Sequence, residues 1–268
     1  LDILTNLPVP KPTLTVEDLS TGMAADELTV HFQPLMDIAT RRIVSAEALV
    51  RWQHPELGLL GPDQFIALAE SGSAIAALTD RVLDSAISEC GQWRVTRDDL
   101  GLGVNVSARV IDDVELPDRI AALCVRHQVP PAAVTLELTE TASSQEPTKM
   151  MDVLTRFRLK GFRLSIDDFG TGYSSLSQLQ RLPFSELKID KAFVTRMATA
   201  KDCRIIAHTV IGMGHNLGMK VVAEGVEDKE TLGMLADAGC DLAQGYYISR
   251  ALPADKIPRF VRERDLVQ

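Results

Sequence analysis

The chain has 268 residues, 46% of them hydrophobic, which is enough to bury the core of one large α/β domain or of two small ones. Its formal net charge of −9 gives no basic field for a polymeric nucleic acid, so any phosphate ligand must be held locally. The cysteines have no CxxC spacing, and no run of about 18 apolar residues could form a transmembrane helix. Composition therefore favours a soluble cytoplasmic protein, with no membrane contact from this segment.

The N-terminal stretch contains Pro8, Pro10 and Pro12, which predicts a stiff linker over residues 1–15 and a folded domain over residues 16–268. A short amphipathic helix is expected at residues 16–26. The first two strands follow at residues 28–34 and 42–51. The loop between these strands is too short for a helical crossover, so we expect them to pair antiparallel.

Strands and helices alternate along the rest of the chain. Further strands are predicted at residues 102–106, 134–138, 163–167, 186–189, 220–224 and 242–248. Helices are predicted at residues 75–93, 116–127, 147–160, 174–182, 201–217, 229–238 and 254–264. Eight strands separated in this way favour a closed β/α barrel with one antiparallel strand. The alternative, an open doubly wound sheet, is weakened because no glycine-rich dinucleotide turn follows the early strands.

Two adjacent carboxylates, Asp167 and Asp168, end the apolar strand predicted at residues 163–167. Side by side at a strand end they repel each other and are costly to desolvate, so a divalent cation is the natural partner. Gly170 and Gly172 follow, and their freedom to adopt positive φ lets the next loop fold back over the bound group. Taken alone, the pair fits a surface turn with a helix N-cap equally well, so its interpretation depends on the other strands.

Most of the other strands carry a single polar residue near the carboxyl end, flanked by small or apolar neighbours. These residues are Glu47, Asn105, Glu137, Lys188, Glu224 and Gln244. Because side chains alternate along a strand, we expect the flanking residues to face the outer helices and the polar ones to converge inside the mouth of the barrel. A lone polar residue in a strand is more often solvent-facing, but acids gathered inside a barrel need ligands. The oxygen-rich set predicts Mg²⁺ or Mn²⁺, and two cations balance its charge better than one.

Seven motifs occur in order along the chain. They are Glu47-Ala48-Leu49 with Arg51, Asn105-Val106-Ser107, Glu137-Leu138-Thr139-Glu140, Asp167-Asp168-Phe169-Gly170, Lys188-Ile189-Asp190, Glu224-Gly225-Val226-Glu227 and Gln244-Gly245-Tyr246. Together they resemble the EAL-domain signature of cyclic di-GMP phosphodiesterases, over residues 17–256 and without departure at a motif position. The resemblance implies a modified TIM-type β/α barrel that hydrolyses cyclic di-GMP to linear pGpG with two Mg²⁺ or Mn²⁺ ions, in bacterial second-messenger signalling.

The resemblance also implies metal ligands and catalytic residues. One cation would be held by Glu47, Asn105, Glu137 and Asp167, and the second by Asp167, Asp168 and Glu224. Catalytic roles fall to Lys188, Asp168, Glu224 and Gln244. Lys188 would hold the attacking water or offset charge on the phosphoryl oxygens, and Gln244 would orient water or a metal ligand. Because the ligands are all oxygen, we expect Ca²⁺ to compete for the site and to inhibit.

Other residues would bind the substrate or anchor a loop. The implied substrate contacts are Gln33, Leu49, Arg51 and Asp190. Arg51 is also open to interpretation as a structural salt bridge. Glu140 would anchor the loop from Phe169 to Ser175, and Glu227 is either a second anchor or a charge at a helix N-terminus. The resemblance further implies a homodimer through this loop and fusion to an upstream sensor, receiver or GGDEF domain.

Three other functions fit parts of the pattern. A non-catalytic cyclic di-GMP receptor is the nearest alternative, and the loss of a metal ligand would mark it, whereas every ligand position is filled here. An unrelated metal-dependent barrel enzyme, such as a lyase with Lys188 as base, leaves Arg51 and the paired glycines unexplained. A structural dimerisation module is the third. Comparing nucleotide turnover with nucleotide binding separates them.

Overall fold

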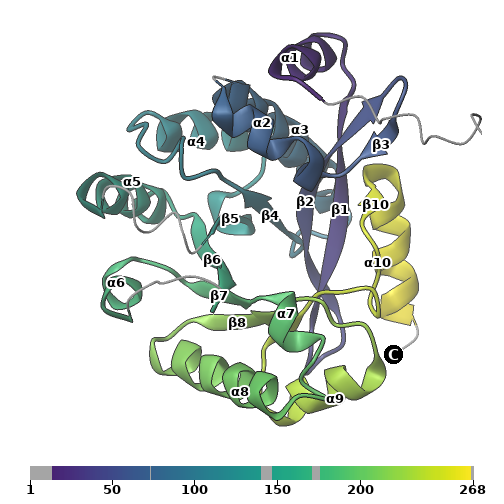
Figure 1. Cartoon of the computed structure of the whole chain (residues 1–268), viewed down its shortest axis with the longest axis vertical. Coiled ribbons are helices and arrows are strands. Elements are labelled where there is room, and N and C mark those ends of the chain that lie inside the picture. Colours follow the sequence, from purple (N-terminus) through teal and green to yellow (C-terminus); the bar gives the residue numbers. More distant parts are fainter. Residues whose placement is uncertain (1–13, 73, 140–146, 171–175, 267–268) are drawn as a thin grey trace, which may run out of the picture.

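Eight strands close on themselves in the computed structural model of the chain, which describes residues 14–72, 74–139, 147–170 and 176–266 (Figure 1). The α-helices are α1 (Val16–Ala24), α2 (Ile66–Ser71), α3 (Ala74–Arg94), α4 (Leu116–Arg126), α5 (Pro147–Leu159), α6 (Leu176–Arg181), α7 (Lys191–Val194), α8 (Lys201–Asn216), α9 (Lys229–Asp237) and α10 (Ile257–Leu266). The strands are β1 (Leu28–Asp37), β2 (Ile43–His54), β3 (Gly58–Leu60), β4 (Gly101–Asn105), β5 (Val134–Thr139), β6 (Arg163–Phe169), β7 (Glu186–Ile189), β8 (Lys220–Ala223), β9 (Leu242–Ala243) and β10 (Leu252–Pro253).

The barrel closes through its first strand. β1 pairs antiparallel with β2 on one side and with β9 on the other. All the other barrel pairs, from β2–β4 round to β8–β9, are parallel. β3 and β10 extend the sheet outside the ring, on β2 and β1 respectively. The predicted α/β fold, a modified TIM-type barrel with one antiparallel strand, is confirmed.

β1 runs past Pro34 to Asp37, although the sequence predicts its end at the proline. Pro34 has no N–H to donate, so a sheet tolerates it only where no partner needs that group. On the side of β1 away from β2, β10 pairs with residues 31–32 and β9 with residues 36–37. Pro34 lies in the gap between these two pairings, and the strand continues through it.

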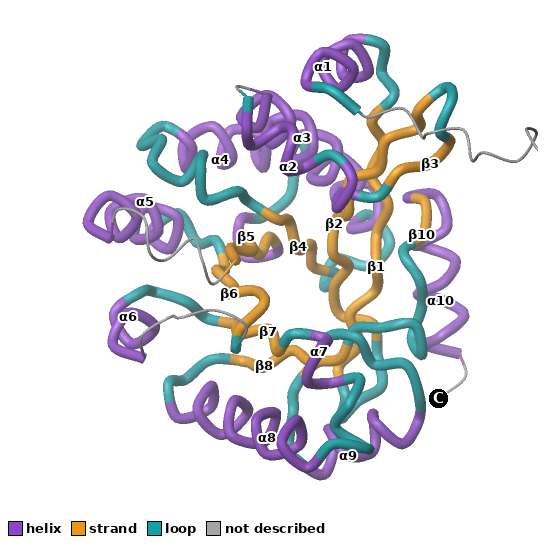
Figure 2. Tube along the Cα trace, in the orientation of Figure 1, coloured by secondary structure: helices purple, strands orange, loops and turns teal. Residues whose placement is uncertain are grey.

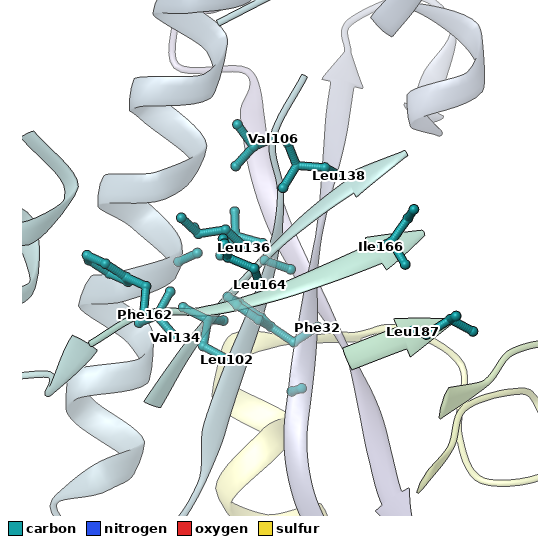
Figure 3. Close-up of a cluster of buried hydrophobic side chains, with 14 of the residues drawn as sticks. Phe32, Leu102, Val106, Val134, Leu136, Leu138, Phe162, Leu164, Ile166 and Leu187 are labelled. Carbon is teal, nitrogen blue, oxygen red and sulfur yellow. The ribbon is translucent and has the colours of Figure 1, made fainter. Parts of the chain in front are cut away.

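The helices surround the barrel from outside (Figure 2). The apolar side chains of the strands are buried in one hydrophobic cluster with those of the helices. Figure 3 shows part of the resulting core, in which Leu102, Leu136, Leu164 and Leu187 come from four neighbouring strands. All four are at most 1% exposed. The residues that alternate with them point into the barrel, as the period of two predicts.

Four short elements, β3, α2, α7 and β10, lie outside the predicted pattern because each is too brief to show a period. The strand predicted at residues 242–248 is wrong beyond Ala243. There, Val226 donates its N–H to the Gln244 carbonyl, and Tyr247 donates to the Val226 carbonyl. A Cβ on Gly245 would lie 2.2 Å from the Val226 oxygen, so only glycine lets the two backbones touch and the chain turn.

None of the described helices is long and apolar enough to cross a bilayer.

The helix predicted at residues 254–264 begins instead as a short 3₁₀ turn before α10. The proposed boundary between a linker and a folded domain stays a prediction, since residues 1–13 lie outside the described ranges.

Candidate active site

The carboxyl ends of the parallel strands deliver one polar side chain each to the barrel mouth. Glu47 lies on β2, Glu137 on β5, Asp167 on β6 and Lys188 on β7, and all four are buried. Glu224 follows β8 directly and is half-buried. The strand period therefore places these groups together, as the alternation along each strand predicts.

Lys188 lies at the centre of the group and is fully buried. Its Nζ donates to Glu137 Oε2 at 2.6 Å and to Glu47 Oε2 at 3.2 Å. The same Nζ is 2.6 Å from Glu224 Oε1 and 3.5 Å from Asp167 Oδ1. One ammonium therefore contacts four carboxyl groups, and bound protons or a further cation must balance the negative charge that remains.

Amide side chains hold Glu47 in place. Gln244 Nε2 donates to Glu47 Oε2 at 2.7 Å, and Asn105 Nδ2 donates to Glu47 Oε1 at 2.7 Å. Gln244 Nε2 also contacts Gln33 Oε1 at 3.2 Å, and Gln33 in turn donates to the Ser249 carbonyl. Gln244 Oε1 is buried and has no hydrogen-bond partner among the described residues. A buried acceptor of this kind fits a bound water or cation beside Glu47.

Asp167, Asp168 and Glu224 form a tighter group that could hold a metal ion. One oxygen from each lies within 4.8 Å of the other two. Asp168 adopts a left-handed φ of 55°, and its N–H donates to Asp167 Oδ1 at 2.9 Å, which turns the second carboxyl group back toward the first. Carboxylate oxygens in this arrangement fit Mg²⁺ or Mn²⁺. Of the predicted first-site ligands, Glu47 and Glu137 instead face Lys188, and Asn105 directs its amide nitrogen to Glu47.

Burial and mutual repulsion shift the pKa values of these groups. Burial raises the pKa of Glu224 to about 8, and the charges of Asp167 and Glu47 add to it. Burial, with Asp167 and Asp190 nearby, raises the pKa of Asp168 to about 6. Burial acts to lower the pKa of Lys188, but the surrounding carboxylates outweigh it and raise that pKa well above its ordinary value. The ammonium is therefore a permanent cation, and Glu224 and Asp168 hold protons more readily than ordinary carboxyl groups, which a bound metal ion would displace.

A cavity of about 330 Å³ opens above these groups. It is lined by Gln33, Glu47, Leu49, Asp167, Lys191, Thr195, Glu224, Gly225, Glu227, Gln244, Gly245 and Tyr246. A second cavity of about 630 Å³ shares Leu49 and extends past Asn105 between β2 and α3, with a mainly apolar lining. The Arg250 guanidinium stacks over the Tyr246 ring, 4.0 Å from its centroid, at the rim. With cations bound to its acidic floor, this cavity and the apolar space beside it would suit a ligand that has both a phosphate and a large ring.

The other predicted site residues are distributed unevenly around the cavity. Gln33, Leu49 and the exposed Glu227 line it, whereas Arg51 does not and donates to the Val50 carbonyl at 2.9 Å. Asp190 is buried and accepts from the Ala192 N–H at 2.7 Å, so it caps α7. Their predicted substrate contacts stay predictions. Glu140 and residues 171–175 of the loop that it is predicted to anchor lie outside the described residues.

Two residues of the site carry no signal that strand periodicity could detect. Gly103 on β4 leaves space for Glu137, because a Cβ there would lie 2.1 Å from Glu137 Oε1. Lys191 lines the cavity from the first turn of α7, beyond the end of β7. The alternation ends with the strand, so only the β7–α7 connection itself could have pointed to this lysine.

Comparison with known proteins shows which family the chain belongs to. The model of the EAL domain matches residues 16–251. The chain therefore belongs to the EAL domain family.

Its relatives include named signalling enzymes. The chain is 38% identical over 247 residues to the cyclic di-GMP phosphodiesterase NbdA of Pseudomonas aeruginosa, covering 92% of this chain and 32% of NbdA. It is 36% identical over 246 residues to the bifunctional diguanylate cyclase/cyclic di-GMP phosphodiesterase MucR of the same organism, covering 90% and 36%. The chain thus spans about a third of the length of these curated relatives.

Solved structures share the architecture. The structure titled PaMucR phosphodiesterase, c-di-GMP complex, superposes with a TM-score of 0.86 at 35% identity, covering 90% of this chain and 98% of that one. The EAL enzyme Bd1971, bound to cAMP and cyclic di-GMP, gives a TM-score of 0.88 at 26% identity, covering 92% and 68%.

Proposed function

We propose that this chain hydrolyses cyclic di-GMP to linear pGpG with two bound divalent cations, Mg²⁺ or Mn²⁺. The observation that carries the proposal is the mouth of the barrel, where Asp167, Asp168 and Glu224 gather beside a cavity and around a buried lysine. Support also comes from the family and from relatives that are named cyclic di-GMP phosphodiesterases.

The donor set fits such cations. Asp167, Asp168 and Glu224 would hold one ion, and Glu47, Asn105 and Glu137 with Asp167 would hold the other. Two bound cations supply Lewis-acid stabilisation of the phosphoryl oxygens and lower the pKa of a water molecule to near neutrality. Divalent ions at these positions would compensate the negative charge that Lys188 alone leaves unbalanced.

The side chains around the acids have separate tasks in the proposed reaction. Lys188, held by four carboxylates, keeps a positive charge under the reacting phosphate and offsets charge that develops on its oxygens. Gln244 fixes Glu47 with its amide nitrogen, and its oxygen, which has no partner among the described residues, would accept a hydrogen bond from a water molecule. Because these groups are buried and mutually bonded, they cost little reorganisation when the reaction begins.

The substrate would lie across the mouth. Its scissile phosphate is placed at the acids, with Gln33 and Leu49 on the cavity wall and Arg51 and Asp190 as outer contacts. The larger apolar cavity beside Leu49 and Asn105 has room for a guanine base. Glu227 lines the smaller cavity and offers an acceptor for the donor edge of the other base.

The proposal extends to the setting of the domain. We infer a cytoplasmic homodimer formed through the loop at residues 169–175, fused to an upstream sensor, receiver or GGDEF domain. The short span of the chain against its relatives supports the fusion. Glu140 and Glu227 would anchor the dimer loop to the site.

One assay tests the proposed reaction. The purified chain is mixed with cyclic di-GMP and Mg²⁺ or Mn²⁺, and the products are separated by chromatography, with an EDTA-treated sample as control. We expect pGpG in the presence of metal and none with EDTA. Tight binding without turnover in either metal would contradict the proposal and favour the non-catalytic receptor. If the chain neither binds nor hydrolyses cyclic di-GMP, the phosphodiesterase and the receptor are both excluded.

A further inference from the structure

Lys191 is the one basic residue among those that line the 330 Å³ cavity in the described part of the chain. Four acids, Glu47, Asp167, Glu224 and Glu227, line the same cavity. The Lys191 side chain is exposed, and within the described ranges no carboxylate forms an ion pair with it. An unpaired ammonium in an acidic cavity has charge available for an anionic ligand.

The backbone that presents Lys191 is fixed on both sides. Asp190 caps α7 through the Ala192 N–H at 2.7 Å, and the Lys191 carbonyl accepts from Thr195 N at 2.9 Å and from Thr195 Oγ1 at 2.8 Å. Gly225, at φ 71°, packs directly against the lysine, since a Cβ there would lie 2.6 Å from Lys191 Cβ. The residue after the acid Glu224 therefore sets the position of the cation opposite it.

Lys191 lies at a different depth from Lys188. Three extended residues span about 10 Å, so Lys191 stands about that far beyond Lys188 toward the rim. Lys188 is buried beneath the proposed metal ligands with four carboxylates, whereas Lys191 faces the open cavity. Lys191 is therefore closer to solvent than Lys188, on the side of the cavity where a second anionic group of a ligand would lie.

We propose that Lys191 binds the second phosphate of the cyclic dinucleotide, the one that is not cleaved, and so positions the substrate. This inference rests on the proposed function, whose substrate carries two phosphodiester groups. One of them is placed at the acids, and the other needs a counter-charge nearer the rim. Arg51, the basic residue that the motif suggests, does not line the cavity.

The test compares two phosphodiesters on the purified, metal-loaded chain. Cyclic di-GMP has a second phosphate, and bis(p-nitrophenyl) phosphate has only the one that is cleaved. For Lys191→Ala we expect kcat/KM for cyclic di-GMP to fall about tenfold more than kcat/KM for the small substrate, chiefly through KM, because a charge-assisted hydrogen bond is lost. Lys191→Arg, which keeps the charge, should restore most of the affinity.

Two further variants separate the effect of the charge from the effects of hydrogen bonding and of substitution at a surface lysine. Lys191→Gln keeps hydrogen-bond donors without charge and should behave like Lys191→Ala if the partner is a phosphate. Lys201→Ala removes an exposed lysine from the start of α8, away from the cavity, and should leave both activities unchanged.

Four results would overturn the inference. Lys191→Ala with wild-type KM for cyclic di-GMP would leave the lysine without a role in binding. Equal losses on both substrates would assign it to the cleaved phosphate or to the fold. Full affinity for cyclic di-GMP in Lys191→Gln would show that the lysine donates to an uncharged group, such as a guanine base, and not to a phosphate. Failure of the proposed function is distinct, because it would appear in the wild-type chain as a lack of both binding and turnover of cyclic di-GMP, and the inference would fall with it.

Discussion

Replacing Lys188 with methionine should destabilise the metal-free protein strongly. Methionine keeps the apolar stem but removes the ammonium that contacts Glu137, Glu224, Glu47 and Asp167 at 2.6, 2.6, 3.2 and 3.5 Å. The carboxylates would then be left together in a buried site without a positive charge. The loss differs from that of an exposed ion pair, because Lys188 is fully buried.

The size of the effect follows from the burial. Removing one partner of a buried ion pair costs about 3–5 kcal/mol. Some of the acids can take up a proton instead of staying charged, since the pKa of Glu224 is already about 8, and this holds the loss within that range. For a chain of this length about 1 kcal/mol corresponds to roughly 2 °C in Tm, so we expect Tm to fall by about 6–10 °C.

Thermal unfolding in EDTA, followed by circular dichroism, measures the loss. Lys191→Met is the matched control: the same substitution three residues along, at an exposed lysine, should change the free energy of unfolding by less than about 0.5 kcal/mol. Saturating Mg²⁺ should recover much of the stability of Lys188→Met, because bound cations replace the missing charge. A Tm for Lys188→Met within 1 °C of wild type in EDTA, judged against roughly 2 °C per kcal/mol, would refute the view that Lys188 holds the acids together.

Three other predictions concern the same site. Asp167→Asn should lower pGpG formation by several orders of magnitude at saturating metal, because it weakens both proposed cation sites, and retention of a tenth of the activity would contradict the two-metal assignment. Ca²⁺ should support binding of cyclic di-GMP in calorimetry but almost no product, and should inhibit when added over Mg²⁺, since its bonds of about 2.3–2.6 Å exceed the 2.0–2.1 Å of Mg²⁺; comparable turnover in the two metals would show that the reaction does not depend on the length of the metal–oxygen bonds. Gly103→Ala should lower the free energy of unfolding by about 1–3 kcal/mol and weaken metal binding, because the added Cβ displaces Glu137. Gly212→Ala is the control, since its Cβ would lie in open space, and it should not destabilise the protein. Equal Tm values for the two variants would show that Glu137 has room to move.

Strand periodicity was sufficient to predict which polar residues meet. Glu47, Glu137 and Lys188 are each flanked by apolar neighbours. Because those neighbours pack against the outer helices, the polar residue between them must point into the barrel. The same logic predicted the antiparallel β1–β2 pair from the length of one loop. These features depend on local sequence and on the closure of the barrel, so they need no knowledge of side-chain packing.

Other features depend on contacts between segments far apart in the chain. The central position of Lys188 among the acids is set by the heights of β2, β5, β6 and β8 relative to β7, which no single strand encodes. The early end of β9 follows from the contact between Gly245 and Val226, and the space for Glu137 follows from Gly103 on the neighbouring strand. Asp190 illustrates the same limit, because the motif alone does not reveal that its carboxylate caps α7.

Lys188 and Lys191 are three residues apart, but we expect the first to stabilise the fold and the second to bind the ligand. The first ends inside the barrel, where its charge is needed whether or not a ligand is bound, because the acids around it cannot otherwise be buried. The second follows the end of the strand, where Gly225 and the Asp190 cap hold it at an open cavity without an acidic partner among the described residues. Water solvates that ammonium in the free protein, so its removal costs the fold little and costs an anionic ligand much. Substitution at Lys188 should therefore appear first in the unfolding curve, and substitution at Lys191 first in KM.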